Sequence, residues 1–241
     1  MTYAQAMQRL PLVAPETLLA QRGLMVVAPH PDDETLGCGG TLLRMADEGA
    51  QLGWLIVTSI SEENGFASQR VHGRDEEIKQ VSALFGFSDV FRLSLPTRQL
   101  DMSPMSELIE QFSAVFKSFR PQQVFLPSRS DVHTDHRAVF DAGAACAKWF
   151  RYPSVRRVLA YETISETEFG LDMREMFQPN YFVDISKYLD RKLEIMSVYA
   201  SEMGAYPFPR SSEAIRALAA LRGTTSGFHA AEAFQLLRER Y

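Results

Sequence analysis

The chain contains 241 residues, of which 46% are hydrophobic and 23% are charged, and its formal net charge is -5. This length and composition fit one soluble α/β domain that buries a continuous core. A mildly acidic chain with scattered basic residues lacks the electrostatic pattern of a nucleic-acid-binding protein. No stretch approaches the roughly 20 apolar residues that span a bilayer, so we predict neither a nucleic-acid partner nor a membrane partner.

The N-terminal 20 residues carry no recognisable targeting signal. They are partly apolar, but Pro11, Pro15 and Glu16 interrupt them, and no basic segment leads into an unbroken apolar stretch. We therefore expect a cytoplasmic protein. The sequence makes no prediction about oligomeric state.

The first predicted strand is the apolar run at residues 24–28, which is bounded by Gly23 and Pro29. Such a run is typical of a buried parallel strand. Apolar residues at helical spacing follow at 39–50, and a second buried strand is predicted at 52–59. Strand, helix and strand in this order form a βαβ unit, whose crossover is right-handed.

The alternation of helices and strands continues through the middle of the chain. We predict helices at residues 74–85, 103–119 and 136–149, and strands at 90–95, 123–127 and 157–162. Repeated strand-then-helix order predicts an α/β fold: a Rossmann-like, doubly wound, mostly parallel sheet with helices on both faces.

The last third of the chain breaks this alternation. We predict a loop at 170–179, a strand at 181–185, a helix at 187–202, a proline-rich turn at 206–210 and helices at 212–222 and 230–238. Because no linker or repeat is evident, we treat residues 1–241 as a single domain. Its core is expected at about 22–165, with C-terminal elements on the substrate side at about 166–241.

One histidine and three carboxylates follow the first predicted strand, in the segment His30-Pro31-Asp32-Asp33-Glu34. Ligands of open α/β sheets bind outside the carboxyl ends of the strands. Carboxylates packed this closely repel one another unless a cation is present. His30 and Asp33 are three residues apart, so both can reach one divalent ion from a tight turn.

A second polar cluster follows the strand predicted at 123–127, and it reads Asp131-Val132-His133-Thr134-Asp135-His136. Loops at the same edge of a sheet converge, so two clusters far apart in sequence can share one ion. Taken alone, either cluster also fits simple helix capping, for example by Asp131 or Thr134. Three of the five histidines lie in these two loops, which favours a metal site.

These two segments resemble the PIG-L or LmbE-like deacetylases. The resemblance rests on the pattern AxHPDDExLGxGGT at residues 28–41 and on HxDH at 133–136. Arg74-x-x-Glu77 and the segment AEAF at 231–234 are weaker matches. That family includes deacetylases of GlcNAc-phosphatidylinositol and of the mycothiol and bacillithiol pathways. The resemblance therefore implies a hydrolase of carbon–nitrogen amide bonds, an N-deacetylase.

The resemblance also implies a catalytic metal site. His30, Asp33 and His136 would bind zinc, and another divalent metal such as iron also suits two histidines and one carboxylate. Asp32 would be the general base that takes a proton from zinc-activated water. His133 would stabilise the oxyanion of the tetrahedral intermediate. Either Asp32 or His133 would protonate the leaving amine.

Three further residues receive roles by the same resemblance. Asp135 would orient His133, and Arg74 would help to hold the substrate. Many family members carry an Asp-Gly pair near the sugar after the third strand, where this chain has Leu95 to Asp101. Asp101 is the candidate to replace that contact.

The expected substrate is a soluble small molecule, an N-acetylglucosamine-like sugar or sugar conjugate, whose identity the sequence does not specify. One alternative is another zinc-dependent amide or carbamoyl hydrolase on the same scaffold, and another is a non-catalytic subunit. The glycines in Gly37-x-Gly39-Gly40 also suggest a dinucleotide-binding domain. Their spacing does not match the G-x-G-x-x-G motif, and the neighbouring carboxylates would repel a pyrophosphate.

Overall fold

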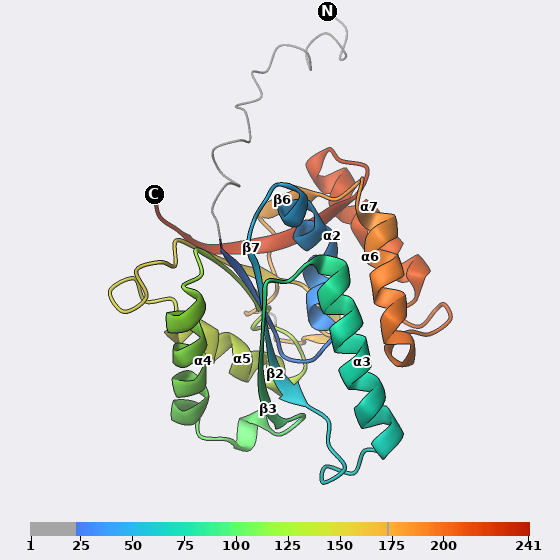
Figure 1. Cartoon of the computed structure of the whole chain (residues 1–241). Coiled ribbons are helices and arrows are strands. Elements are labelled where there is room, and N and C mark those ends of the chain that lie inside the picture. Colours follow the sequence, from blue (N-terminus) through green and yellow to red (C-terminus); the bar gives the residue numbers. More distant parts are fainter. Residues whose placement is uncertain (1–22, 173) are drawn as a thin grey trace, which may run out of the picture.

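The computed structural model describes residues 23–172 and 174–241. The expectations for the N-terminal 20 residues, and for a domain that starts at residue 1, concern residues outside these ranges. Within them, helices cover both faces of a seven-stranded sheet (Figure 1). This confirms the predicted Rossmann-like, doubly wound, mostly parallel α/β fold. In the part of the chain that the structure describes, no helix combines the length and the apolar character needed to cross a membrane.

The sheet has the strand order β3-β2-β1-β4-β5-β7-β6. β1 to β5 run parallel, whereas β7 is antiparallel to both β5 and β6. The strands are β1 (Leu24–Ala28), β2 (Leu52–Ser59), β3 (Asp89–Pro96), β4 (Gln123–Pro127), β5 (Arg157–Tyr161), β6 (Tyr181–Asp184) and β7 (Ala231–Glu239). The first six agree with the predicted strands to within one residue at either end.

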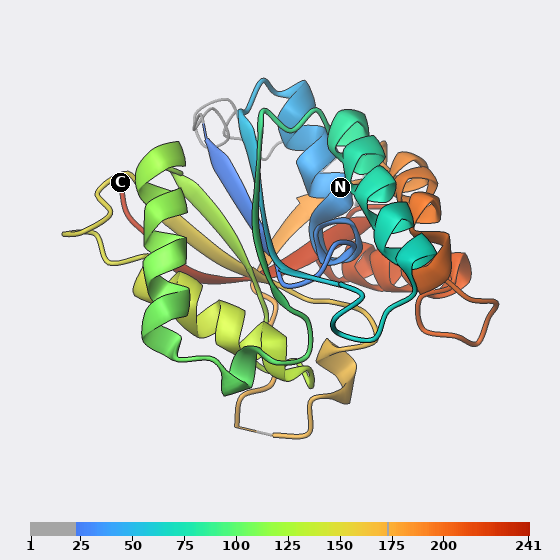
Figure 2. The ribbon, with the colours of Figure 1, turned by 60° about the horizontal axis from the view of Figure 1, so that its bottom comes forward.

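Two hydrophobic cores lie on opposite faces of this sheet. The helices are α2 (Asp33–Asp47), α3 (Ser68–Phe85), α4 (Met105–Phe119), α5 (Thr134–Ala145), α6 (Leu189–Met196) and α7 (Ser212–Ser226). Figures 1 and 2 show α4 and α5 on one face and α2, α3, α6 and α7 on the other. In β1, Leu24 and Val26 face one core while Met25 and Val27 face the other. Burial on both faces explains the continuous apolar run in this strand.

The helix predicted at 230–238 is wrong, because these residues form strand β7. The segment is rich in alanine, glutamate, leucine and arginine, which are good helix formers. Between β5 and β6, however, it forms backbone hydrogen bonds on both sides, and Ala231 and Phe234 are fully buried. Tertiary pairing outweighs local propensity here.

Other helix boundaries also differ from the predictions. α2 starts at Asp33, immediately after the acidic turn, and not at residue 39. The helix predicted at 136–149 is α5, which ends at Ala145. The helix predicted at 187–202 is divided into α6 and a 3-10 segment, η4, at Ser197–Glu202.

Helix α2 is broken at Cys38, whose φ and ψ are -145° and 19°. The break leaves backbone groups without helical partners, and distant side chains satisfy them. Lys192 Nζ donates to Leu36 O at 2.8 Å, and the Glu232 carboxylate accepts from the amides of Gly40 and Thr41. Lys192 thus holds the short first segment of α2, which carries Asp33, and Glu232 holds the start of the segment after the break.

The order of the strands places the two polar clusters side by side. β1 and β4 are neighbours, with Leu24 paired to Gln123 and Val26 to Phe125. The chain leaves β1 toward β2 and leaves β4 toward β5, in opposite directions across the sheet. Loops that diverge in this way open a crevice at the carboxyl ends of the strands. The loops after β1 and β4 are the segments that contain the predicted metal ligands.

Candidate active site

Three histidine side chains meet in the crevice between β1 and β4. The ring centroids of His30 and His133 are 4.6 Å apart, those of His30 and His136 are 5.3 Å apart, and those of His133 and His136 are 5.5 Å apart. His30 comes from the loop after β1, and the other two come from the start of α5. The two sequence clusters therefore form one site.

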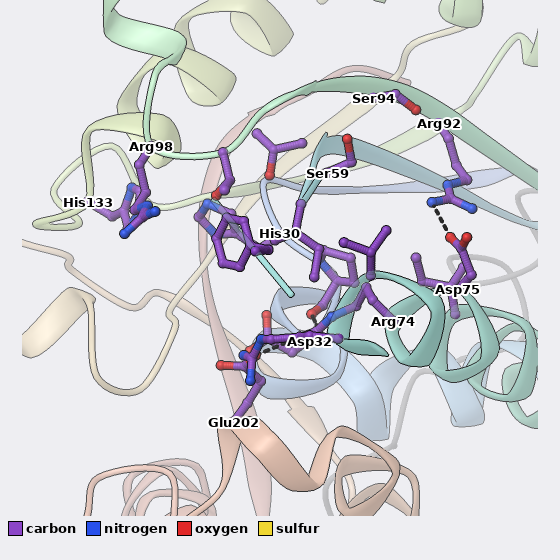
Figure 3. A pocket seen from close by; sticks show the side chains of 18 of the residues that line it. His30, Asp32, Ser59, Arg74, Asp75, Arg92, Ser94, Arg98, His133 and Glu202 are labelled. Carbon is purple, nitrogen blue, oxygen red and sulfur yellow. Dashed lines mark hydrogen bonds and ion pairs between the residues drawn. The ribbon is translucent and has the colours of Figure 1, made fainter. Parts of the chain in front are cut away.

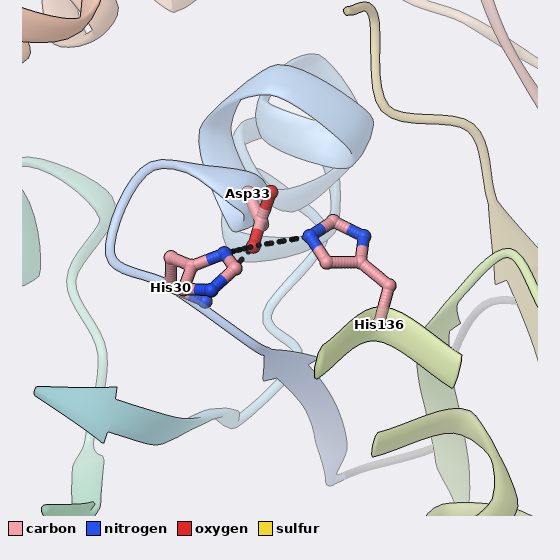
Figure 4. Close-up of side chains that lie close together, drawn as sticks. All are labelled: His30, Asp33 and His136. Atoms are coloured by element: carbon pink, nitrogen blue, oxygen red, sulfur yellow. Dashed lines mark hydrogen bonds and ion pairs between the residues drawn. The ribbon is translucent and has the colours of Figure 1, made fainter. Parts of the chain in front are cut away.

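Asp33 lies between two of these histidines (Figure 4). Its Oδ2 atom is 3.3 Å from His30 Nδ1 and 3.4 Å from His136 Nε2. Zinc bonds of about 2.0–2.1 Å at a tetrahedral angle separate neighbouring ligand atoms by about 3.3–3.4 Å. One ligand atom from each of the three residues lies within 4.8 Å of the others. His30, Asp33 and His136 therefore fit a divalent metal site in both donor type and spacing.

The surrounding carboxylates make this cluster attractive to cations. Burial by itself lowers the pKa of His30, but hydrogen bonds to Asp135 and Asp33 outweigh it and raise this pKa to about 9. Burial raises the pKa of Asp33, but the neighbouring His136 and His30 hold it well below its usual value. Positive charge is thus stabilised at the point where the three ligand atoms converge.

Asp131 supports His136 from behind. Its Oδ2 atom lies 2.8 Å from His136 Nδ1, and its Oδ1 atom accepts a hydrogen bond from Thr167 Oγ1 at 2.6 Å. A carboxylate on the far nitrogen of a metal-binding histidine fixes the ring and leaves the other nitrogen for the metal. The sequence suggested helix capping for Asp131. The sequence does carry one indication of this supporting role, because Asp131 lies only five residues before His136.

The sequence predicts that Asp135 orients His133. Asp135 does contact His133, but through its backbone N–H, while its carboxylate has other partners. Asp135 Oδ2 lies 3.1 Å from His30 Nε2 and accepts the backbone N–H of Arg98 at 2.6 Å, while Oδ1 accepts that of Leu100 at 3.1 Å. Asp135 therefore supports the metal-ligand candidate His30, as Asp131 supports His136. At the start of α5 its side chain faces β1, so it reaches the histidine of the other loop.

His133 is positioned by the backbone of α5. It is the N-cap residue, and its Nδ1 atom accepts the N–H of Asp135 at 3.1 Å. Burial, and then the neighbouring His30 and His136, lower the pKa of His133 to about 4. The ring is therefore neutral near pH 7. With Nδ1 as an acceptor, the proton resides on Nε2, which can donate to a ligand.

Asp32 is buried at the floor of the same crevice, with 3% of its surface exposed. Burial and the adjacent Asp33 carboxylate raise the pKa of Asp32 to about 8, although Arg210 opposes this shift. A carboxylate with a pKa near neutrality suits proton transfer at physiological pH. Glu34 contributes to the shape of the turn, because its Oε2 accepts the Asp32 N–H at 3.0 Å.

A cavity of about 400 Å³ opens over these residues (Figure 3). Its volume suits a small polar ligand such as a sugar conjugate. Four of the predicted site residues line it, namely His30, Asp32, Arg74 and His133. Asp33, His136 and Asp135 are buried beneath it.

Arg74 lines the cavity, but most of its guanidinium is already bound to protein groups. It donates to Pro31 O at 3.0 Å, pairs with Glu202, and lies 3.3 Å from Glu77 Oε2. Arg74 therefore holds the backbone of the acidic turn in addition to facing the cavity.

Asp101 does not line this cavity, and its contact with the sugar stays a prediction. It lies in the short 3-10 segment η2 (Leu100–Met102), where Leu100 points inward and is 1% exposed. The next side chain, Asp101, then points into solvent. Arg98 and Thr97, two residues of the same loop, line the cavity in its place.

Three cavity residues come from the C-terminal part of the chain and were missed by the sequence analysis. They are Glu166, Glu202 and Arg210. Arg210 Nη1 lies 2.8 Å from Asp32 Oδ2. No sequence motif marks these residues, because they are isolated in loops and at helix ends far from the two polar clusters.

The fold and the site together define an α/β protein with a candidate hydrolytic metal centre at the switch point of its sheet, and comparison with known proteins gives the family. The model of the PIG-L family, GlcNAc-PI de-N-acetylase, matches residues 25–147, a range that contains both polar clusters. The chain belongs to the PIG-L family, which confirms the predicted membership.

Individual relatives agree with this assignment. The diacetylchitobiose deacetylase of Thermococcus kodakarensis is 25% identical over 231 residues, which cover 89% of this chain and 82% of the relative. The conserved protein TT1542 of Thermus thermophilus has a TM-score of 0.73 at 30% identity, covering 91% of this chain and 97% of that chain. The N,N'-diacetylchitobiose deacetylase of Pyrococcus horikoshii shares the fold, with a TM-score of 0.73 at 20% identity over 99% and 94% of the two chains.

Proposed function

We propose that this protein is a metal-dependent deacetylase that hydrolyses the N-acetyl amide of an N-acetylglucosamine-like sugar or sugar conjugate. The observation that carries the proposal is the position of Asp33 Oδ2, 3.3 and 3.4 Å from nitrogens of His30 and His136, with Asp32 beside it at the floor of a cavity. Membership of the PIG-L family and the name of the Thermococcus relative support this chemistry.

His30, Asp33 and His136 would hold the metal, with zinc favoured and iron also suited to the ligand set. A bound divalent ion supplies Lewis acidity, which lowers the pKa of a water molecule and polarises the acetyl carbonyl. Asp131 and Asp135 would keep the two histidine rings in the orientation that this binding requires.

Asp32 would act as the general base. Its carboxylate is buried at the cavity floor, next to the proposed ligand Asp33, so it can accept the proton of a water that attacks the amide carbon. Its pKa of about 8 also allows it to return that proton to the leaving amine. His133 is the other candidate from the sequence, but a neutral ring with a pKa lowered to about 4 favours Asp32 for this step.

His133 would stabilise the negative charge that develops on the acetyl oxygen. Its Nδ1 accepts a backbone N–H, so Nε2 carries the proton of the neutral ring and can donate it into the cavity. A donor fixed in advance by a helix N-cap needs no rearrangement during the reaction, which is the condition for efficient oxyanion stabilisation.

The cavity would bind the sugar through polar groups from both parts of the chain. Arg98 and Thr97 come from the loop after β3, and Glu166 comes from the region after residue 165, where Glu202 and Arg210 also line the cavity without being assigned a contact to the sugar. We therefore infer that the domain consists of a core at about 22–165 and of elements at about 166–241 that lie on the substrate side, as the sequence predicts. Its substrate would be a soluble small molecule, processed in the cytoplasm without a membrane or nucleic-acid partner.

A substrate panel tests the proposal directly. Purified protein is incubated with N-acetylglucosamine, N,N'-diacetylchitobiose, a carbamoyl sugar and an acetyl-lysine peptide. Released acetate and hydrolysis of the carbamoyl sugar are measured before and after chelation and zinc addition. We expect acetate from a sugar substrate, loss of activity with chelator and recovery with zinc. Preference for the peptide would overturn the sugar assignment, and full activity in chelator would overturn the metal mechanism. Hydrolysis of a carbamoyl sugar without acetate release would instead identify a different amide hydrolase.

A further inference from the structure

Arg210 makes a set of contacts that neither the metal site nor the general base requires by itself. Its guanidinium donates to Asp32 Oδ2 at 2.8 Å, to Ser165 Oγ at 2.7 Å and to Glu166 Oε1 at 3.2 Å. The side chain is 17% exposed and lines the cavity. Because three of its nitrogens have fixed partners, the guanidinium is held in one orientation beside Asp32.

Asp32, the partner of Arg210, has an unusual backbone conformation. Its φ is 135°, in a region that residues other than glycine rarely adopt. Such a conformation costs about 1–3 kcal/mol and persists only where surrounding contacts enforce it. The backbone N–H of Asp32 binds Glu34, while Arg210 is the one side chain in the described ranges that donates to the Asp32 carboxylate.

Glu202 connects Arg210 to the other side of the same turn. One of its oxygens, Oε1, pairs with Arg74, which donates to Pro31 O, and the other, Oε2, lies 3.6 Å from Arg210 Nη1. Figure 3 shows Asp32, Arg74 and Glu202 gathered on one side of the cavity. Arg74 and Arg210 thus share the Glu202 carboxylate. Arg74 holds the backbone of Pro31, and Arg210 holds the side chain of the next residue, Asp32.

We propose that Arg210 is a positioning residue for the reaction, which holds the Asp32 carboxylate in its working orientation while Glu202 braces Arg210 and Arg74 together. This inference rests on the proposed function, because it takes Asp32 as the general base. Arg210 binds Oδ2, which leaves Oδ1 as the oxygen free to receive the proton. A base displaced by about 1 Å can lose about 10²-fold in rate, so the guanidinium acts on kcat through Asp32.

The test compares Arg210→Met with Arg222→Met as a matched control. Arg222 is also an arginine of the C-terminal region paired with one carboxylate, Glu162, at 2.5 Å, but it does not line the cavity over Asp32. For each variant, kcat and KM for N,N'-diacetylchitobiose and N-acetylglucosamine, zinc content and the thermal unfolding midpoint are measured.

For Arg210→Met we expect kcat to fall by about 10²-fold with KM changed less than about threefold. Zinc content should be unchanged. Arg222→Met should retain kcat within about twofold. Arg210→Lys, which keeps the charge but loses the planar fork, should recover part of the lost kcat. Added guanidinium should raise the rate of Arg210→Ala and leave that of Arg222→Ala unchanged.

Several results would overturn the inference. A raised KM at constant kcat would make Arg210 a substrate contact, and loss of zinc would place its effect on the metal site. If Arg210→Met does not fold, Arg210→Lys decides, and wild-type kcat in that variant would count against the positioning role.

A crystal structure of Arg210→Met gives a readout that is independent of activity. We expect the Asp32 side chain to move, and an unmoved carboxylate would overturn the inference. If the wild-type protein releases no acetate from any N-acetyl sugar, the proposed function fails, while this crystal structure still tests the contact between Arg210 and Asp32.

Discussion

Asp131 Oδ2 lies 2.8 Å from Nδ1 of His136 and thereby determines which nitrogen of that ring faces Asp33. The two residues are five positions apart, at the end of the β4 loop and in the first turn of α5. Asp135 and His30 form the equivalent pair across the two loops, at 3.1 Å. Each histidine of the proposed metal site therefore has its own buried carboxylate.

The first prediction concerns this supporting role of Asp131. Asp131→Ala should weaken zinc binding by about 10- to 100-fold, because the His136 ring loses the partner that orients it. Competition with a chromophoric chelator measures the affinity. Asp172→Ala is the control, since Asp172 is exposed and, among the described residues, pairs only with Arg174. Unchanged zinc affinity in Asp131→Ala would show that His136 does not depend on this carboxylate.

The second prediction separates the two adjacent carboxylates of the acidic turn. Asp32→Asn should retain zinc and lose about 10²- to 10⁴-fold in kcat, the usual size of a general-base contribution. Asp33→Asn should lower zinc content, because its oxygen lies between the two histidine nitrogens. Elemental analysis beside acetate release distinguishes them. The reverse pattern would exchange the two assignments.

The third prediction concerns His133 as a donor to the oxyanion. His133→Ala should bind zinc normally and lose about 10²- to 10³-fold in kcat, as other enzymes do when an oxyanion donor is removed. His72→Ala is the control, because His72 is exposed and bonds only to Ser68 in the described chain. Loss of zinc from His133→Ala would instead identify a ligand.

The fourth prediction concerns the stability of the broken helix. A Cβ atom on Gly37 would lie 2.2 Å from a carbon of the Tyr161 ring, which is fully buried. Gly37→Ala should therefore lower the free energy of unfolding by about 1–3 kcal/mol, as overpacked core substitutions do. Urea unfolding measures the change.

Gly73→Ala is the matched control for that helix variant. Gly73 lies within α3, and a Cβ there would meet none of the described residues within 4 Å. It should stabilise the protein by about 0.4–1 kcal/mol, because alanine restricts the unfolded chain. Equal effects of the two substitutions would mean that Gly37 and Tyr161 do not pack as described.

The sequence by itself determined the parallel part of the sheet and the centre of the site. The apolar runs of β1, β2 and β4 are buried on both faces, so their composition alone marks them as strands. His30 and Asp33 are brought together by one turn, and His133 and His136 by another. Short-range geometry of this kind can be predicted from residue spacing.

Only the tertiary structure decided the features that depend on distant partners. β7 is a strand because β5 and β6 offer backbone hydrogen bonds that local helix propensity cannot match. The Asp135 carboxylate supports His30 while its backbone N–H binds His133, and Arg210 reaches Asp32 across 178 positions of the chain. Such contacts follow from where the folded chain places each residue, and no local pattern in the sequence encodes that placement.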